Sequence, residues 1–170
     1  MAARMAKTPL AIAEAGTADA GILFVNDAFA SLLESEAATW IGRPLGALSA
    51  AGPSPVVAGE TTHFEVALDG GRRLPVALSI ALVPGPAGDP VCLLCSLVDA
   101  RGDGATQAIE RDARMLAQVA LAAGELMSEA AAAARLSAPE GDDAQAQWQA
   151  QAIAREALRR TVHPSPGGAA

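Results

Sequence analysis

The sequence is poor in aromatic residues and in cysteine. Only 3% of the 170 residues are aromatic and none is tyrosine, so few rings are present to hold a flat cofactor. The two cysteines, Cys92 and Cys95, lie in one apolar run, and a zinc site would need a second pair. Positions three apart on a strand face opposite sides, which favours two buried thiols over a redox pair.

Basic patches and long apolar runs are also missing. The net charge is -7 at pH 7 and the arginines are scattered, so nothing in the sequence would attract nucleic acid or an anionic membrane surface. No run approaches the roughly 20 apolar residues that span a bilayer, and residues 1–15 form a poor signal peptide. We therefore expect a cytoplasmic protein with no nucleic acid and no membrane among its partners.

The residues that catalysis or metal binding requires do not occur in a suitable arrangement. His63 has neither a cysteine nor a second histidine placed to complete a metal site, so we interpret it as an outward-facing strand residue. His163 is followed by Pro164 at the end of a predicted helix, unlike a phospho-accepting histidine, and no phosphate-binding glycine loop is present. We predict that the chain is not an enzyme and binds no metal.

Composition divides the chain into a folded module and a helical tail. Residues 9–101 hold short apolar runs separated by turn residues. Residues 105–136 are dominated by alanine, with no proline and one glycine, which predicts a long helix. The breakers after it are followed by a second predicted helix over 143–162, and residues 163–170 are predicted to be disordered.

The module itself is predicted to contain strands and short helices in a definite order. Strands are predicted over 10–15 and 22–25, and Asn26 or Asp27 can cap a helix over 28–34. Apolar residues then alternate over 62–68 and 74–83, around the hairpin signal Asp69-Gly70-Gly71. Residues 91–98 are apolar on both faces, which predicts a central strand.

Four segments of this module resemble PAS domains. They are Gly21-Ile22-Leu23-Phe24-Val25-Asn26-Asp27-Ala28-Phe29, Trp40-Ile41-Gly42-Arg43-Pro44-Leu45, Asp69-Gly70-Gly71-Arg72-Arg73-Leu74-Pro75-Val76 and Val98-Asp99-Ala100-Arg101. The resemblance covers residues 9–101 in the order and spacing of the family. It implies an α+β fold, with a five-stranded antiparallel sheet, short helices on one face, and the predicted helices following at the C-terminal side.

One departure from the family bears on cofactors. Family members often carry a longer helix before the last three strands, which forms one wall of the cofactor pocket. Residues 49–59 contain Gly52, Pro53, Pro55 and Gly59, and these breakers exclude a regular helix of that length. That segment also has no histidine for haem, and residues 41–48 have no cysteine for flavin photochemistry. We expect no cofactor.

Polar residues at recurrent positions of the resemblance are candidates for coupling the sheet to the tail. They are Arg43, Asp99 and Arg101. Asp99 can pair with Arg101, or with Arg111 or Arg114 on the predicted helix. The alternative interpretation is that these are ordinary solvated charges.

The tail has an apolar pattern close to that of a coiled coil. Its seam is formed by Ile109, Leu116, Val119 and Leu126. The helix can dimerise or transmit a signal through this seam, or it can fold back onto the small residues Ala77, Ser79 and Ala81 of its own sheet. On the second helix, Trp148 can anchor a partner or pack on the first helix.

The function that this organisation favours is protein–protein interaction. We expect a single-domain PAS regulatory protein that forms a homodimer and docks to a signalling kinase or scaffold in bacterial two-component or cell-cycle signalling. The alternatives are a PAS sensor of a small ligand or cofactor, and the sensory part of a larger histidine kinase.

Overall fold

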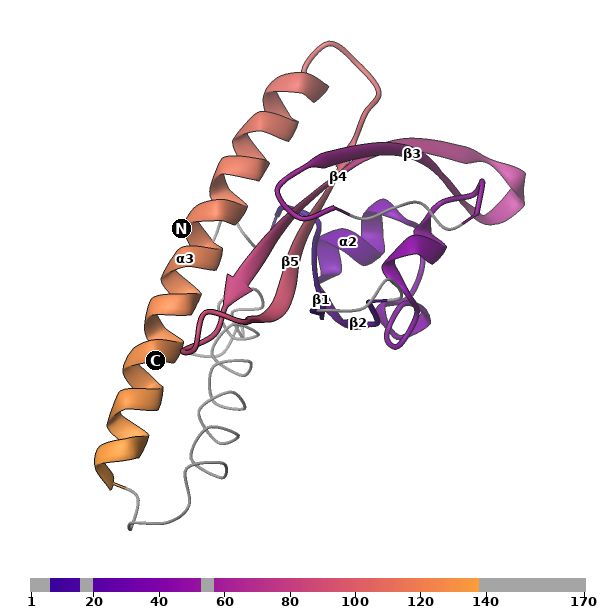
Figure 1. Ribbon diagram of the computed structural model, residues 1–170. Coiled ribbons are helices and arrows are strands. Elements are labelled where there is room, and N and C mark those ends of the chain that lie inside the picture. The colour runs from indigo at the N-terminus through magenta and orange to yellow at the C-terminus, as the bar shows by residue number, and fades with distance from the viewer. Residues whose placement is uncertain (1–6, 16–19, 53–56, 138–170) are drawn as a thin grey trace, which may run out of the picture.

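The computed structural model describes residues 7–15, 20–52 and 57–137. In chain order it contains β1 (Leu10–Glu14), β2 (Ile22–Val25), α2 (Asp27–Leu32), the 3₁₀ turns Ala37–Thr39 and Leu45–Leu48, β3 (Thr61–Ala67), the 3₁₀ turn Asp69–Gly71, β4 (Arg73–Pro84), β5 (Pro90–Asp99) and α3 (Ala105–Ser137), as Figure 1 shows. The predicted helix over 143–162, the segment 163–170 and Trp148 lie outside the described residues.

The strands form one antiparallel sheet in the order β2-β1-β5-β4-β3. β5 lies in the middle and pairs with β1 from Leu10↔Ser96 to Glu14↔Cys92, and with β4 from Val76↔Asp99 onward. The predicted central strand is thus β5, because its apolar residues are covered on both faces. The fold class is confirmed: a five-stranded antiparallel sheet with short helices on one face and a helix after the last strand.

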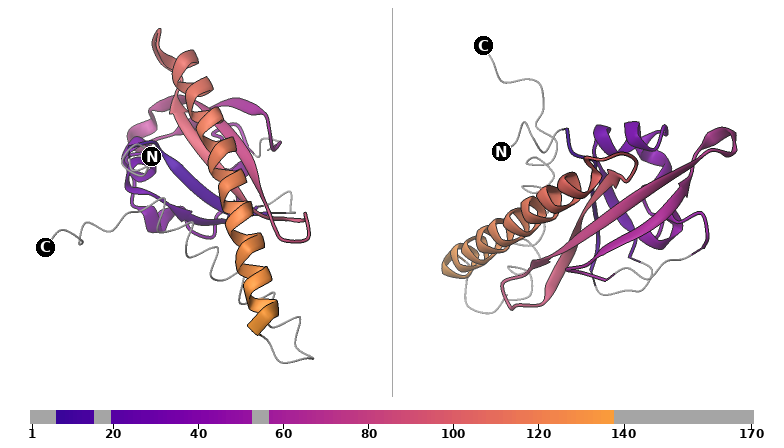
Figure 2. Two further views of the ribbon diagram at one scale, coloured as in Figure 1. Left: turned by 90° about the vertical axis from the view of Figure 1, so that its left-hand side faces the viewer. Right: turned by 90° about the horizontal axis from the view of Figure 1, so that it is seen from above.

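The two faces of the sheet are covered by different elements (Figure 2). The inner face packs against α2 and the 3₁₀ turns, around Phe29, Trp40 and Leu45. The outer face packs against α3 through Leu116 and Val119. Cys95 belongs to the inner core and Cys92 to the outer one, and both are buried, which confirms that the two thiols lie on opposite faces.

Asn26 connects the start of α2 to β1. Its side-chain Oδ1 accepts hydrogen bonds from the backbone N–H groups of Phe29 (2.9 Å) and Leu10 (3.0 Å), and its Nδ2 donates to the carbonyl of Thr8 (2.8 Å). Of the two predicted cap residues the structure therefore uses Asn26, whose buried amide both donates and accepts. Asp27 becomes the exposed first residue of the helix, where its charge suits the helix dipole.

The long helix folds back onto its own sheet. α3 contacts β4 and β5, and the small residues Ser79 and Ala81 allow it to approach closely. Leu116 and Val119 are buried in this contact, whereas the exposed fraction of Leu126 is 58%. Leu126 was predicted to lie in the same seam as Leu116 and Val119. That prediction is wrong for the sheet-facing side of α3, because Leu126 is not buried against the sheet. A straight helix turns about 20° per heptad away from a seven-residue repeat, so Met127 is buried there instead.

Candidate interaction surfaces

The inner face of the sheet carries a buried apolar core, and the resemblance to PAS domains implies that a cofactor, if one were bound, would lie there. Buried apolar residues form this core, and the partly buried Leu32, Ala37, Ala58, Phe64 and Leu68 pack against it. A cavity able to hold a three-ring cofactor would leave the side chains around it accessible to water.

Trp40 closes one end of this core, beside Phe29. The two rings meet edge to face, with centroids 6.2 Å apart and planes at 81°. The Trp40 Nε1–H donates to Ser35 Oγ at 2.6 Å, and the Arg43 guanidinium lies 5.6 Å from the Trp40 ring centre. Arg43 therefore packs over an aromatic ring, and among the described residues it forms no ion pair with Asp99.

Asp99 and Arg101 form a local pair at the end of β5. The Arg101 side chain donates to both carboxylate oxygens of Asp99, at 2.6 Å from Nη2 to Oδ2 and 2.9 Å from Nε to Oδ1. These hydrogen bonds hold the pKa of Asp99 below its usual value. Of the partners considered for Asp99, the structure uses Arg101.

Neither helix arginine considered for Asp99 reaches it. Arg111 bonds to Asp112 and Arg114 bonds to Glu110. Of the alternatives for Asp99, the pairing with a helix arginine is not formed, because Arg111 and Arg114 each bond to a carboxylate within α3. The chain joins β5 to α3 through residues 100–104, where Gly102 has a φ of 93°.

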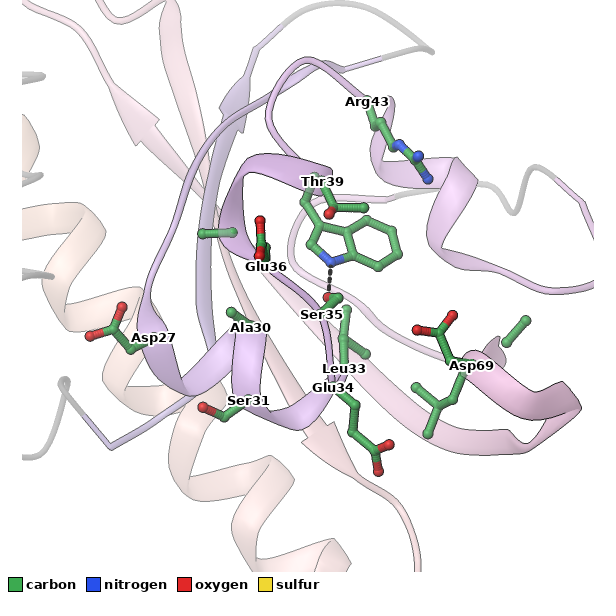
Figure 3. Close-up of a pocket in the computed structure, with 14 residues that line it drawn as sticks. Asp27, Ala30, Ser31, Leu33, Glu34, Ser35, Glu36, Thr39, Arg43 and Asp69 are labelled. Atoms are coloured by element: carbon green, nitrogen blue, oxygen red, sulfur yellow. Dashed lines mark hydrogen bonds between the residues drawn. The ribbon is translucent and has the colours of Figure 1, made fainter.

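An open acidic cleft of about 950 Å³ lies beside α2 and the β3–β4 turn (Figure 3). Its carboxylates are contributed by Asp27, Glu34, Glu36 and Asp69, and its rim includes Arg43. Glu34 adopts a φ of 50° at the end of α2 and forms an ion pair with Arg72. This pair joins α2 to the β3–β4 turn, and the surplus of negative charge makes the cleft unsuitable for anionic ligands.

A second cavity, the α3 groove, lies between α3 and the sheet and has a volume of about 380 Å³. It is mainly apolar, with a hydroxyl pair formed by Thr61 Oγ1 and Ser79 Oγ 2.9 Å apart. Its rim carries two of the most exposed large apolar side chains, Leu82 (46%) and Leu121 (63%). Leu82 lies on the same face of β4 as the buried Leu78 and Ile80, but the helices of the inner face do not cover it.

The described residues contain no cluster of three or more histidine, cysteine or acidic side chains that could hold a metal ion. His63 is exposed on β3, as its interpretation as an outward-facing residue requires. In the same part of the chain, no helix combines the length and the apolar character needed to cross a membrane.

No family model and no curated protein matches the chain. Its strand order and the helices on one face match the PAS fold that the four sequence segments imply. The chain has a PAS fold. The similar solved structures include a light-oxygen-voltage domain studied with a flavin analogue, which is 16% identical with a TM-score of 0.49. The match covers 67% of this chain and 93% of that domain.

Two further solved structures with this PAS-like architecture are light-oxygen-voltage proteins. An RNA-binding receptor is 20% identical with a TM-score of 0.47, and the match covers 66% of this chain and 35% of the receptor. The light state of a blue-light photoreceptor domain is 17% identical with a TM-score of 0.46, over 65% of this chain and 95% of that domain. Likeness at this level carries no conclusion about ligand or activity.

Proposed function

We propose that this PAS-like module is a cytoplasmic signalling protein that acts through contacts with other proteins. In this proposal it forms a homodimer and docks to a signalling kinase or scaffold. The observation that carries it is the contrast between its two sides. The inner face of the sheet carries a buried apolar core, whereas large apolar side chains are exposed on α3, at Leu121 and Leu126. Exposed apolar side chains are typical of surfaces that other proteins cover.

In this proposal α3 is the output element. Five residues, 100–104, separate it from β5, and it lies along the outer face of the sheet, where Leu116 and Val119 are buried. A change in the sheet is therefore transmitted directly to the helix, and a partner that holds the helix biases the sheet in return.

The experiment that tests this function combines native mass spectrometry with an absorbance spectrum of the full-length protein. We expect the mass of a homodimer and no absorbance above the protein band. A bound chromophore, or a metabolite released on denaturation, would contradict the proposal and establish the alternative of a cofactor or ligand sensor. A protein that stays monomeric at all concentrations tested would contradict the homodimer part of the proposal.

A further inference from the structure

β4 continues beyond the strand that pairs with it. The β3–β4 pairing begins at Thr61↔Ser79, whereas β4 stays paired with β5 as far as Pro84↔Pro90. Residues 80–84 therefore have a neighbouring strand on the β5 side and none on the β3 side within the described part of the chain. Figure 1 shows β4 running past the start of β3 toward α3.

The chain before β3 turns away from this edge. Gly59 donates its backbone N–H to the carbonyl of Ile80 at 2.8 Å, and the N–H of Glu60 bonds to the carbonyl of Val57 at 3.3 Å, which closes a turn. Gly59 has a φ of 84°, a conformation that glycine adopts without strain. Ile80 is therefore the last residue of β4 that accepts a backbone hydrogen bond from the described residues just before β3.

The backbone of Leu82 is left with an open edge. Amide groups alternate in direction along a strand, so those of Leu82 project to the same side as the carbonyl of Ile80. No described residue forms a backbone hydrogen bond with Leu82 on that side. An edge of this kind pairs readily with an extended segment of another chain.

The α3 groove coincides with the position of the missing strand. Residues 58–61 form one end of it, β4 from Ser79 to Leu82 forms its side, and Ala113 to Leu121 of α3 form the other wall. A strand placed there would direct alternate side chains toward Leu121 and toward Leu82, which are 63% and 46% exposed. Both features, the open backbone edge and the apolar walls, suit an extended peptide.

We propose that the α3 groove binds an extended segment of a partner protein, which adds to the sheet as a strand beside Leu82. The charges at its two ends define the partner further. Glu60 lies at one end of the free edge, and Asp89 lies in the loop at the other, and neither forms an ion pair with a described residue. The segment that fits has small apolar residues at alternate positions and a basic residue at each end.

The same charges oppose a second copy of this chain as the occupant. Two β4 edges that pair about Leu82 run antiparallel, because the contact is two-fold symmetric. Glu60 of one copy would then approach Asp89 of the other, and like charges opposite each other destabilise a contact. This inference rests on the proposed function and specifies where one of its protein contacts is made.

The test uses full-length, isotope-labelled protein and a short synthetic peptide in which valine and threonine alternate between terminal lysines. We expect the peptide to shift the amide resonances of Leu82 and Leu121 and to slow hydrogen exchange at the Leu82 amide. A peptide with N-methylated alternate amides cannot form the strand hydrogen bonds, and one with terminal glutamates loses the charge match. Both should bind at least tenfold more weakly.

Two variants of α3 form a matched pair for this test. Leu121→Glu places a charge in the groove, whereas Leu126→Glu makes the same change at a site of similar exposure, 58%, that does not line the groove. Leu121→Glu should weaken binding of the lysine peptide at least tenfold, and Leu126→Glu should change it less than twofold. Equal effects of the two variants, or undiminished binding of the N-methylated peptide, would overturn strand addition.

Failure of this inference can be separated from failure of the proposed function. A chromophore-free dimer that does not bind the lysine peptide keeps the proposed function and overturns the groove as a strand site. A protein that carries a chromophore but binds the peptide with the expected pattern among the variants overturns the proposed function and keeps the groove as a strand site. If the peptide shifts only resonances of the acidic cleft, it binds there by charge alone, and the strand site is also overturned.

Discussion

Gly124 of α3 lies directly against Pro84 at the end of β4. A Cβ atom built on Gly124 would stand 2.6 Å from Pro84 Cγ and 3.1 Å from the Pro84 carbonyl oxygen. The only glycine of α3 thus lies where the helix approaches the end of β4 too closely for a Cβ atom. Its position explains why a residue unfavourable for helix formation occurs in an alanine-rich helix.

Gly124→Ala should destabilise the protein although alanine favours helix. The propensity gain is about 1 kcal/mol, while overpacking a tight contact costs about 1–3 kcal/mol. We expect a lower midpoint of urea denaturation and faster hydrogen exchange in α3. Ala122→Gly, at an exposed position of the same helix, measures the propensity alone and should cost about 1 kcal/mol. A Gly124→Ala protein that is more stable by that amount would refute the contact.

Asn26→Ala should be among the more damaging single substitutions in the described part of the chain. It removes the cap of α2, worth about 1 kcal/mol, and leaves the buried N–H of Leu10 without its partner, at about 1–3 kcal/mol more. We expect a loss of about 2–4 kcal/mol in the free energy of unfolding, measured by urea denaturation. The neighbouring Asp27→Asn should change it by less than about 0.5 kcal/mol, because Asp27 is exposed.

Arg101→Ala should raise the pKa of Asp99 toward the ordinary value of an aspartate. The hydrogen bonds from Arg101 lower that pKa in the folded protein. Their contribution to stability is therefore complete above the ordinary aspartate pKa of about 3.9 and is lost as the pH falls through the lowered folded-state pKa. An NMR titration of the Asp99 carboxyl group measures the shift directly.

The control for this titration is Arg111→Ala. Arg111 bonds to Asp112 within α3, so its removal should leave the pKa of Asp99 unchanged. A larger shift in Arg111→Ala than in Arg101→Ala would show that Asp99 is coupled to the helix after all.

Cys92 should react with a thiol reagent faster than Cys95. Both are buried, and burial raises the pKa of Cys95, so neither reacts readily in the folded protein. Cys92 lies beneath α3, and detachment of the helix alone exposes it, whereas Cys95 requires opening of the inner core. Mass spectrometry of the labelled peptides gives both rates. Gly124→Ala should increase the rate at Cys92 selectively, and equal acceleration at both would argue against a separate detachment of α3.

Much of the fold follows from local patterns in the sequence. The alternation around Asp69-Gly70-Gly71 located β3 and β4, and the doubly apolar run at 91–98 identified the central strand, because strand periodicity and turn chemistry act over a few residues. The sequence pattern did not decide between Asn26 and Asp27 as the helix cap. That choice depends on the hydrogen bond between Asn26 and Leu10 of β1, which is distant in the sequence.

The candidate site depended on contacts that no local pattern encodes. Over one or two turns, the positions of a seven-residue repeat stay on the same face of a straight helix, and further along they drift away from it. The pattern therefore placed Leu116 and Val119 correctly on the buried seam but also included Leu126, which is exposed. The alternation over residues 74–83 shows which side chains share a face of the strand, but the point at which the covering layer ends, before Leu82, is set by tertiary structure. The β3 pairing starts only at Thr61↔Ser79, too late in the chain to cover residues 80–84, and this free edge could be recognised only in the sheet itself.

The position of Trp40 has a practical consequence for following the unfolding of this protein. Its indole packs against Phe29 within the inner core, on the side of the sheet away from α3. Replacing Trp148 by phenylalanine would leave Trp40 as the sole source of tryptophan fluorescence, and that signal would report on the inner core alone. Far-ultraviolet circular dichroism is dominated by helix and so would follow α3. Superimposable curves from the two optical signals would mean that core and helix are lost in one cooperative step.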